Sequence, residues 1–89
     1  MYQLKLTSGA QRQLDKVPAD ALERIVAALK RLGDNPRPSG AKKLKGSIYR
    51  IRVGDWRIIY AIFDKDNLVL VGKIARRSKD TYDRVNDSF

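Results

Sequence analysis

The chain has 89 residues, with 19 Lys and Arg against 10 Asp and Glu, and a formal net charge of +9. It contains no cysteine and no histidine, which excludes disulfides, thiolate or imidazole metal sites, and catalytic pairs built on Ser/His or Cys/His. We expect one domain spanning residues 1–89, with no metal or cofactor.

The hydropathy of the sequence indicates whether the chain has a membrane-spanning segment or a signal peptide. No apolar run reaches the length needed to span a bilayer, and the first residues enter a strand-like pattern without the apolar segment of a signal peptide. We therefore expect a cytoplasmic protein with no membrane partner. The excess of cations favours a polyanionic partner.

The first half of the chain predicts a strand followed by a helical hairpin. Residues 2–6 alternate apolar and polar side chains, the period of a half-buried strand. Thr7 or Ser8 is placed to cap a helix over residues 9–16, which ends at Val17-Pro18. A second helix begins at residues 18–20, ends at Gly33, and carries apolar residues at helical spacing: Leu22, Ile25, Val26, Leu29 and Leu32.

The second half predicts a meander of strands. Residues 34–40 form a loop by composition, leading into a basic segment over residues 42–46. Strands are expected at residues 48–53, 56–63 and 68–75, and a short helical turn over 79–85 closes the chain. The order β-α-α-β-β-β, with the first strand pairing into an antiparallel three-strand meander, predicts an α+β fold with the helices on one face of the sheet.

The cations gather in two blocks. The second block, from residue 73 to 79, has no acidic residue, and the first, from residue 37 to 57, has only Asp55. A surface adapted only for solubility intersperses both signs, so this clustering favours a face that binds a polyanion. The cations in these blocks are Arg37, Lys42, Lys43, Lys45, Arg50, Arg52 and Arg57, then Lys73, Arg76, Arg77 and Lys79.

Three arginines lie in the predicted hairpin around Gly54-Asp55. Side-chain alternation places Arg50 and Arg52 on one face of their strand, and the turn brings Arg57 close to Arg52 if it faces the same side. Arginine forks bind phosphates and stabilise the charge that develops on a phosphorane, but they are poor general bases. RNA supplies its own 2′-hydroxyl nucleophile, which leaves alignment and charge neutralisation to the protein, with a Tyr or Lys for proton transfer. The alternative is that these arginines only occupy the solvent face of a one-sided sheet.

Aromatic residues are interleaved with these cations. Tyr49, Trp56 and Tyr60 are candidates for stacking on splayed bases. Trp56 and Tyr60 share one side of a strand, so we expect at least one of them in the core. If the last strand pairs antiparallel with the Trp56 strand, Arg76 or Arg77 lies toward the end at which Arg57 begins.

The whole chain resembles the RelE/ParE toxin superfamily, and especially the RelE-like mRNA interferases of type II toxin–antitoxin systems. The most specific match is Lys43-Leu44-Lys45-Gly46, followed by Tyr49-Arg50-Ile51-Arg52-Val53-Gly54-Asp55-Trp56-Arg57-Ile58-Ile59-Tyr60; lesser matches are residues 34–38, Ile74-Ala75-Arg76-Arg77 and Tyr82. The resemblance implies a metal-independent endoribonuclease that acts on the ribosome, cuts mRNA in the A site by 2′-hydroxyl attack and inhibits translation under stress. It also implies a cytoplasmic toxin neutralised by an acidic, RelB-like cognate antitoxin, with a toxin–antitoxin heterotetramer as one possible assembly.

The resemblance also implies site roles. The basic residues of the first hairpin strand, which act as base and phosphate ligands in the family, match Arg50 and Arg52, and the arginine after the turn matches Arg57. The family's arginine at the end of the last strand matches Arg77, with Arg76 in the alternative register. Its C-terminal tyrosine matches Tyr82, for which packing of the closing helix is the simpler role. RNA or ribosome binding is expected of Arg37, Lys42, Lys43, Lys45, Arg76 and Lys79.

One departure from the family pattern bears on mechanism. The best-studied members have lysines where this chain has Arg50 and Arg52. An arginine keeps the phosphate contact but is a worse proton acceptor, so the sequence leaves the general base open.

Two other functions stay open. ParE-like proteins of the same fold inhibit DNA gyrase without enzymatic chemistry and need no basic catalytic cluster. A basic RNA- or ribosome-binding module that has lost catalysis would bind with a steep salt dependence and yield no cleavage products.

Overall fold

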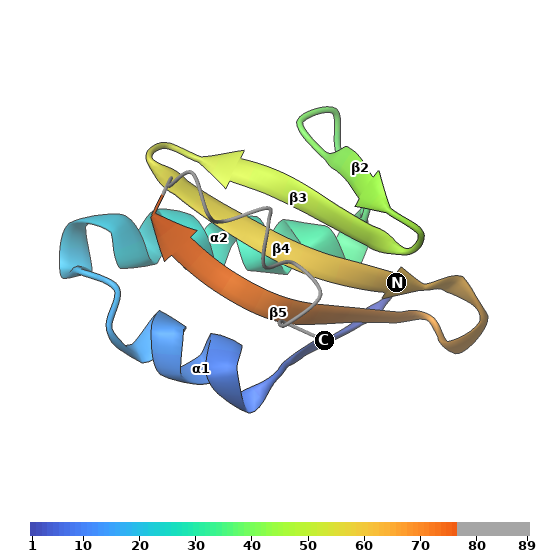
Figure 1. Cartoon of the computed structure of the whole chain (residues 1–89), viewed down its shortest axis with the longest axis horizontal. Helices are drawn as coiled ribbons and strands as arrows, with labels where there is room; N and C mark the ends of the chain where they lie inside the picture. Colours follow the sequence, from blue (N-terminus) through green and yellow to red (C-terminus); the bar gives the residue numbers. More distant parts are fainter. Residues whose placement is uncertain (77–89) are drawn as a thin grey trace.

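The computed structural model describes residues 1–76, which form a five-stranded sheet with two helices (Figure 1). Arg77, Lys79, Tyr82 and the helical turn predicted over residues 79–85 lie outside the described residues. The elements in chain order are β1 (Gln3–Leu6), α1 (Ser8–Asp15), α2 (Ala19–Asp34), β2 (Lys42–Lys45), β3 (Ile48–Val53), β4 (Trp56–Phe63), a single 3₁₀ turn η1 (Asp64–Asp66) and β5 (Leu68–Arg76).

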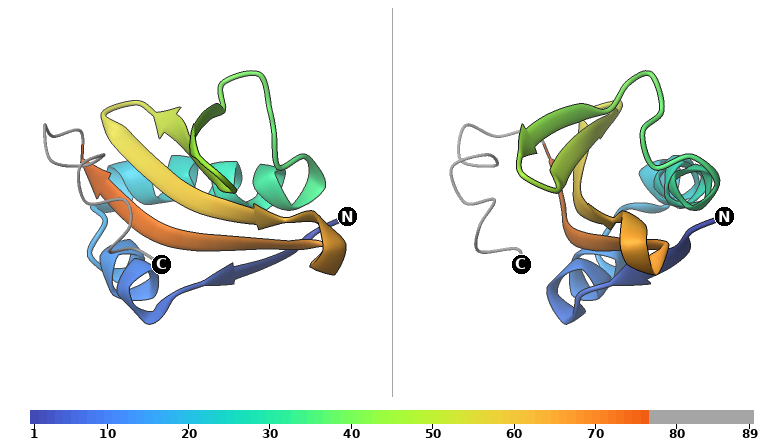
Figure 2. Two further views of the ribbon diagram at one scale, coloured as in Figure 1. Left: turned by 45° about the vertical axis from the view of Figure 1, so that its right-hand side comes forward. Right: turned by 90° about the vertical axis from the view of Figure 1, so that its right-hand side faces the viewer.

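The sheet has the strand order β1-β5-β4-β3-β2. Strands β2 to β5 pair antiparallel with their neighbours, and β1 pairs parallel with β5. Figure 2 shows α2 running across one face of the sheet. These observations confirm the predicted α+β meander and place its N-terminal strand beside the last strand.

The core lies between the helices and one face of the sheet. On α2 the predicted apolar stripe is confirmed, since Ile25, Leu29 and Leu32 are buried, whereas Leu22 and Val26 are half-buried. Alternate residues of the two central strands pack against this stripe, as the period of a strand requires. The buried cluster consists of Ala10, Val17, Ala21, Ile25, Ala28, Leu29, Leu32, Ile58, Tyr60, Ile62, Val69, Val71 and Ile74.

The first helix begins at the predicted cap. The hydroxyl of Thr7 accepts a hydrogen bond of 3.1 Å from the backbone N–H of Ala10, which satisfies one of the free donors of the first turn. Neither described helix is long and apolar enough to cross a membrane.

Strand β2 was not predicted as a strand, because the sequence identified residues 42–46 only as a basic segment after a loop. Lys42 and Lys43 pair antiparallel with Arg50 and Tyr49 of β3, so the basic segment forms the edge of the sheet. Three lysines in four residues carry no alternating apolar signal. They suit an edge strand, because charged side chains discourage pairing with another chain.

A buried tyrosine connects the sheet to the loop that follows α2. Tyr60 is 0% exposed, and its hydroxyl donates a 2.7 Å hydrogen bond to the backbone oxygen of Pro36. Its ring stacks on Tyr49 with 6.1 Å between the centroids. Burial raises the pKa of Tyr60 to about 12, so the hydroxyl stays a donor at neutral pH.

A surface ion pair holds the next residue of the same loop. The Arg37 guanidinium lies 2.9 Å from the Asp64 carboxylate, which also accepts a 2.6 Å hydrogen bond from the Tyr2 hydroxyl. The Nε of Arg37 donates to the Tyr49 hydroxyl at 3.2 Å. These contacts connect the start of the chain, the loop after α2 and the turn after β4.

We expect Tyr60→Phe to lower the free energy of unfolding by about 1 kcal/mol, because the buried Pro36 carbonyl loses its donor. Urea denaturation measures the change. Tyr49→Phe is the matched control, since Tyr49 is half-buried and its hydroxyl accepts a hydrogen bond from the exposed Arg37. An equal loss in both variants would contradict the role given to the Pro36 hydrogen bond.

Stability should also depend on the charge of Asp64. Hydrogen bonds from Arg37 and then Tyr2 hold the pKa of Asp64 below its ordinary value of 3.8. The stabilisation is therefore complete above the unfolded-state pKa and is lost as the pH falls through the lower folded-state pKa. Melting temperatures between about pH 2 and pH 7 should lose part of their acid-side slope in Asp64→Asn. Asp66→Asn, which removes the same charge from the same turn, should keep that part of the slope.

Candidate functional site

The face of the sheet opposite the helices carries the three hairpin arginines. Arg52 and Arg57 pair directly across the two strands, and Arg50 pairs with Ile59 on the same side. Alternation along β3 and β4 points all three side chains away from the helix-covered core. The prediction that these arginines share one face is confirmed, and we call it the arginine face.

Lysines extend the same face on both sides of the hairpin. Lys42 lies opposite Arg50 and Lys45 opposite Ile48, both from the edge strand β2. Lys73 of β5 lies opposite Ile59. None of the five described strands contains an Asp or Glu. The like charges on this face repel one another and favour a polyanionic partner.

The arginines differ in burial. Arg52 is exposed, Arg50 is half-buried and Arg57 is only 3% exposed. The Nε of Arg50 is buried and finds no hydrogen-bond acceptor within the described part of the chain. A buried charged donor is costly unless an acceptor satisfies it. The burial of Arg50 and Arg57 therefore argues against the alternative that these arginines are ordinary solvent-facing cations.

Some predicted site residues lie elsewhere. Arg37 belongs to the ion pair with Asp64, and Lys43 pairs with Tyr49 and so faces the helix side of the sheet. Arg76 lies at the same end of the sheet as Arg57, as expected. It pairs with Trp56, however, and its guanidinium sits 5.2 Å from the centre of that ring, on the other face. RNA contacts by Arg37, Lys43 and Arg76 remain a prediction, at positions away from the arginine face.

The aromatic residues are also on the helix side. Tyr60 is buried in the core, which confirms the prediction that at least one of Trp56 and Tyr60 lies there. The prediction that Tyr60 stacks on bases is wrong, because its ring is not exposed. Tyr49 packs on Tyr60 and Trp56 packs against the core. Among the described strand residues, the aromatic on the arginine face is Phe63, 39% exposed, which was not predicted as a site residue. The available signal was its position six residues after Arg57, on the same side of one strand.

The hairpin tip is held from the helix side. Gly54 has φ +60°, and a Cβ there would lie 3.2 Å from the Arg24 guanidinium of α2. The Arg76–Trp56 stack braces the next residues. Two cations, Arg24 and Arg76, thus lie near the tip that carries Arg52 and Arg57 without sharing their face.

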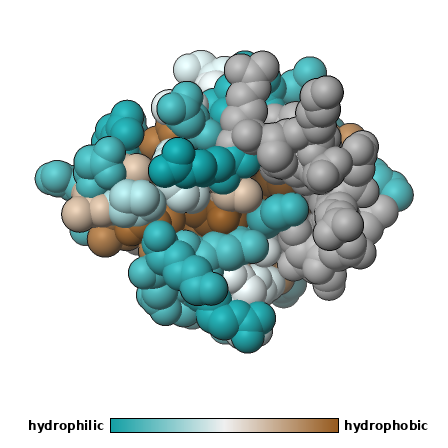
Figure 3. All heavy atoms as spheres, turned by 60° about the vertical axis from the view of Figure 1, so that its left-hand side comes forward, coloured by the Kyte–Doolittle hydropathy of each residue, from teal (hydrophilic) through white to brown (hydrophobic). Residues whose placement is uncertain are grey.

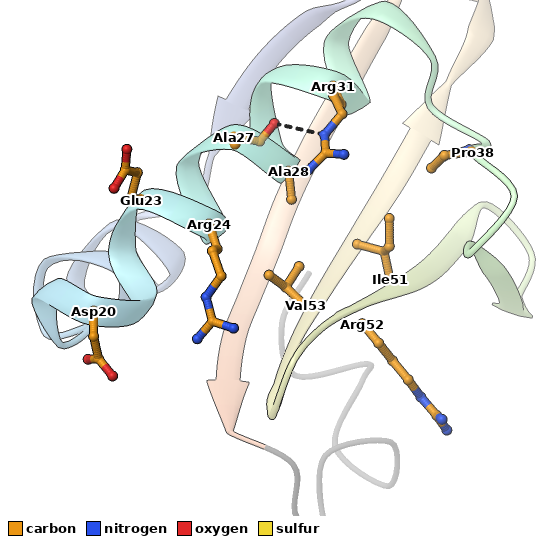
Figure 4. Close-up of a pocket in the computed structure, with 10 residues that line it drawn as sticks. All are labelled: Asp20, Glu23, Arg24, Ala27, Ala28, Arg31, Pro38, Ile51, Arg52 and Val53. Carbon is orange, nitrogen blue, oxygen red and sulfur yellow. Dashed lines mark hydrogen bonds between the residues drawn. The ribbon is translucent and has the colours of Figure 1, made fainter.

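A groove of about 530 Å³ runs between α2 and β3. Figure 4 shows Arg24 and Arg31 directed toward it over Ile51 and Val53, whereas Arg52 points away. Figure 3, viewed toward the end of the molecule on the left of Figure 1, shows hydrophobic surface between hydrophilic rims. Asp20 and Glu23 also line the groove, so it holds both signs of charge and does not extend the arginine face.

Comparison with known proteins assigns the chain to a family. The family model of the ParE toxin of the type II toxin–antitoxin system parDE matches residues 4–81. The chain belongs to this family. A curated relative, RelE1 of Methanocaldococcus jannaschii, is 28% identical over 81 residues, covering 85% of this chain and 90% of the relative.

Solved structures agree with this assignment. The archaeal RelE–RelB complex of Pyrococcus horikoshii matches with a TM-score of 0.79 and 27% identity, covering 88% of this chain and 97% of that one. The RelBE2 complex of Mycobacterium tuberculosis matches with a TM-score of 0.75 and 26% identity, over 85% and 98% of the two chains. Isolated Escherichia coli RelE, at 20% identity and a TM-score of 0.77 over the full length of both chains, shares the fold. The protein is a type II toxin–antitoxin toxin of the RelE/ParE superfamily.

Gly54 should tolerate no side chain. Gly54→Ala would place a Cβ on a left-handed residue and push the Arg24 guanidinium away, so we expect a loss of about 1–2 kcal/mol in unfolding free energy. Gly40→Ala is the control, because its Cβ would meet only Ile51 at 3.9 Å. Chemical denaturation of both variants makes the comparison, and a fully stable Gly54→Ala protein would refute the constraint.

Proposed function

We propose that this toxin is a ribosome-dependent mRNA endoribonuclease that cleaves in the A site and thereby inhibits translation. The observation that carries the proposal is the placement of Arg50, Arg52 and Arg57 on one sheet face whose strands contain no acidic residue. A rigid sheet holds these guanidinium groups at fixed separations, which suits a phosphate backbone and not a neutral substrate.

The chemistry requires no metal. The 2′-oxygen of the substrate attacks the adjacent phosphorus, the bond to the 5′-oxygen breaks, and the products carry a 2′,3′-cyclic phosphate and a 5′-hydroxyl. One proton leaves the 2′-hydroxyl and one joins the leaving oxygen. Arg52 and Arg57 neutralise the non-bridging oxygens as charge develops, and the burial of Arg57 strengthens this effect because the local dielectric is low.

Proton transfer needs other groups. Arginine is too weak an acid to exchange a proton near neutral pH, so Arg50 and Arg52 bind and orient the backbone. Arg77 and Tyr82, which the family resemblance assigns to the transition-state charge and to proton transfer or stacking, keep these roles as predictions.

The proposed regulator is an acidic, RelB-like cognate antitoxin in the cytoplasm. Two neighbouring structures are complexes of RelE-type and RelB-type proteins. The net charge of +9 of this chain complements an acidic partner. A toxin–antitoxin heterotetramer is the assembly we expect.

The family name supports a second candidate. Because the matching model describes ParE, inhibition of DNA gyrase without catalysis is the alternative function. A supercoiling assay with purified protein tests it directly, and inhibition that survives loss of the hairpin arginines would favour it.

Primer extension on an mRNA translated in a cell-free system tests the enzyme. We expect wild-type protein to produce cleavage only with ribosomes, Arg57→Ala to lower the cleavage rate about 100-fold or more, and Arg52→Ala about tenfold or more. Arg31→Ala is the matched control, since it removes an exposed arginine of α2, on the helix side of the sheet, and should cleave normally.

The two arginine variants separate folding from chemistry. Arg57 is buried, so its replacement can also destabilise the protein, whereas Arg52 is exposed. Full cleavage activity in folded Arg52→Ala and Arg57→Ala proteins would contradict the proposal. Intact mRNA with wild-type protein would move the assignment to gyrase inhibition or to a binding module without catalysis.

A further inference from the structure

The arginine face has a second, apolar end. Along β3 and β4, away from the hairpin tip, the side chains on this face change from Arg52, Arg57 and Arg50 to apolar residues. A cavity of about 400 Å³ lies there, at the turn between β2 and β3. Its apolar lining comes from Ile48, Ala61, Phe63 and Leu70.

Phe63 is the aromatic surface of this end. It is 39% exposed and, with Met1, is one of two exposed large hydrophobic residues in the described structure. Lys45 lines the same cavity on the β2 side, and Lys5 of β1 pairs with Leu70 on the other side. Lysines therefore lie on both sides of this apolar end, in the row of residues next to Phe63 and on the face that also carries the arginines.

The distance between the two ends suits one nucleic-acid strand. Phe63 is six residues from Arg57 along β4, which is about 20 Å at the rise of a strand. Stacked nucleotides advance about 3.4 Å each, so this span takes about six nucleotides, and fewer when the strand is extended. A short single strand therefore reaches both the arginines and Phe63.

We propose that the apolar end around Phe63 is a stacking site for an unpaired base of the same single-stranded RNA whose backbone lies on Arg50, Arg52 and Arg57. The inference rests on the proposed function and adds a base-binding site to it. Proteins that bind single strands combine a cationic track with aromatic platforms, because every base presents a π-face. A duplex would keep its bases paired and leave Phe63 exposed to water.

Binding of a fluorescein-labelled RNA of about ten nucleotides, followed by anisotropy at about 50 mM salt, tests the site. The RNA is 2′-O-methylated so that it cannot be cleaved. We expect Phe63→Ala to weaken binding about tenfold and Phe63→Trp to bind as tightly as wild type. Phe63→Leu keeps apolar area without a ring and should resemble Phe63→Ala. Thermal melts of the three variants check that each is folded, so that weaker binding is not caused by unfolding.

A scan of the RNA identifies the contact itself. Oligonucleotides with one abasic nucleotide at each position should show one or two positions at which wild type loses affinity and Phe63→Ala loses no more. Arg52→Ala, in contrast, should weaken all of these oligonucleotides equally, as a phosphate contact does.

The outcomes separate this inference from the proposed function. Equal RNA affinity of wild type and Phe63→Ala, with ribosome-dependent cleavage intact, overturns the stacking site alone and leaves the apolar end to a protein partner such as an acidic amphipathic helix. Absence of both RNA binding and cleavage by wild type overturns both proposals.

Discussion

The register of the β3–β4 hairpin determines both the core and the site. Across the turn at Gly54-Asp55, Arg52 pairs with Arg57 and Val53 with Trp56. A slip of one residue would move every side chain of one strand to the other face and put arginine into the core. Burial of each large apolar side chain contributes about 1.5–3 kcal/mol, and several such side chains of the hairpin pack on the helix side. Apolar packing therefore wins, and it holds the arginines together despite their repulsion.

The two faces of the sheet divide stability from binding. On the helix side, two cations have partners within the fold: Arg37 bonds to Asp64 and Tyr49, and Arg76 stacks on Trp56. On the arginine face the strands supply cations and no acids. The like charges of these strands repel one another, and a bound polyanion relieves that repulsion.

Most of the fold could be predicted because its signals are local. Alternation and turn residues placed β3 and β4 at their observed bounds, and helical spacing found the buried stripe of α2. Strand β2 was missed because an edge strand of lysines has no apolar pattern, and its pairing with β3 becomes visible only in the sheet.

The site was partly predictable for the same reason. Residue parity placed Arg50, Arg52 and Arg57 on one face, since alternation within a hairpin needs no tertiary information. The position of Arg76 depended on the register between β4 and β5, which a shift beyond Ile59 complicates. Arg37 bonds to Tyr49 and Asp64, which are distant from it in the chain, so no local sequence pattern could predict these contacts. Phe63 was detectable by parity but was read as part of an apolar strand.

Under the proposed function, an arginine-based site suits a substrate that the ribosome has already ordered. The described part of the arginine face offers cations to a phosphate backbone, and guanidinium groups are poor proton acceptors. Within the proposed function, these groups orient the backbone and neutralise charge, and proton transfer falls to other groups. A strand held by the ribosome arrives already ordered, so part of the entropic cost of alignment is met before the toxin binds. Free RNA must be ordered by the toxin alone, so the full entropic cost of alignment then opposes binding to the toxin.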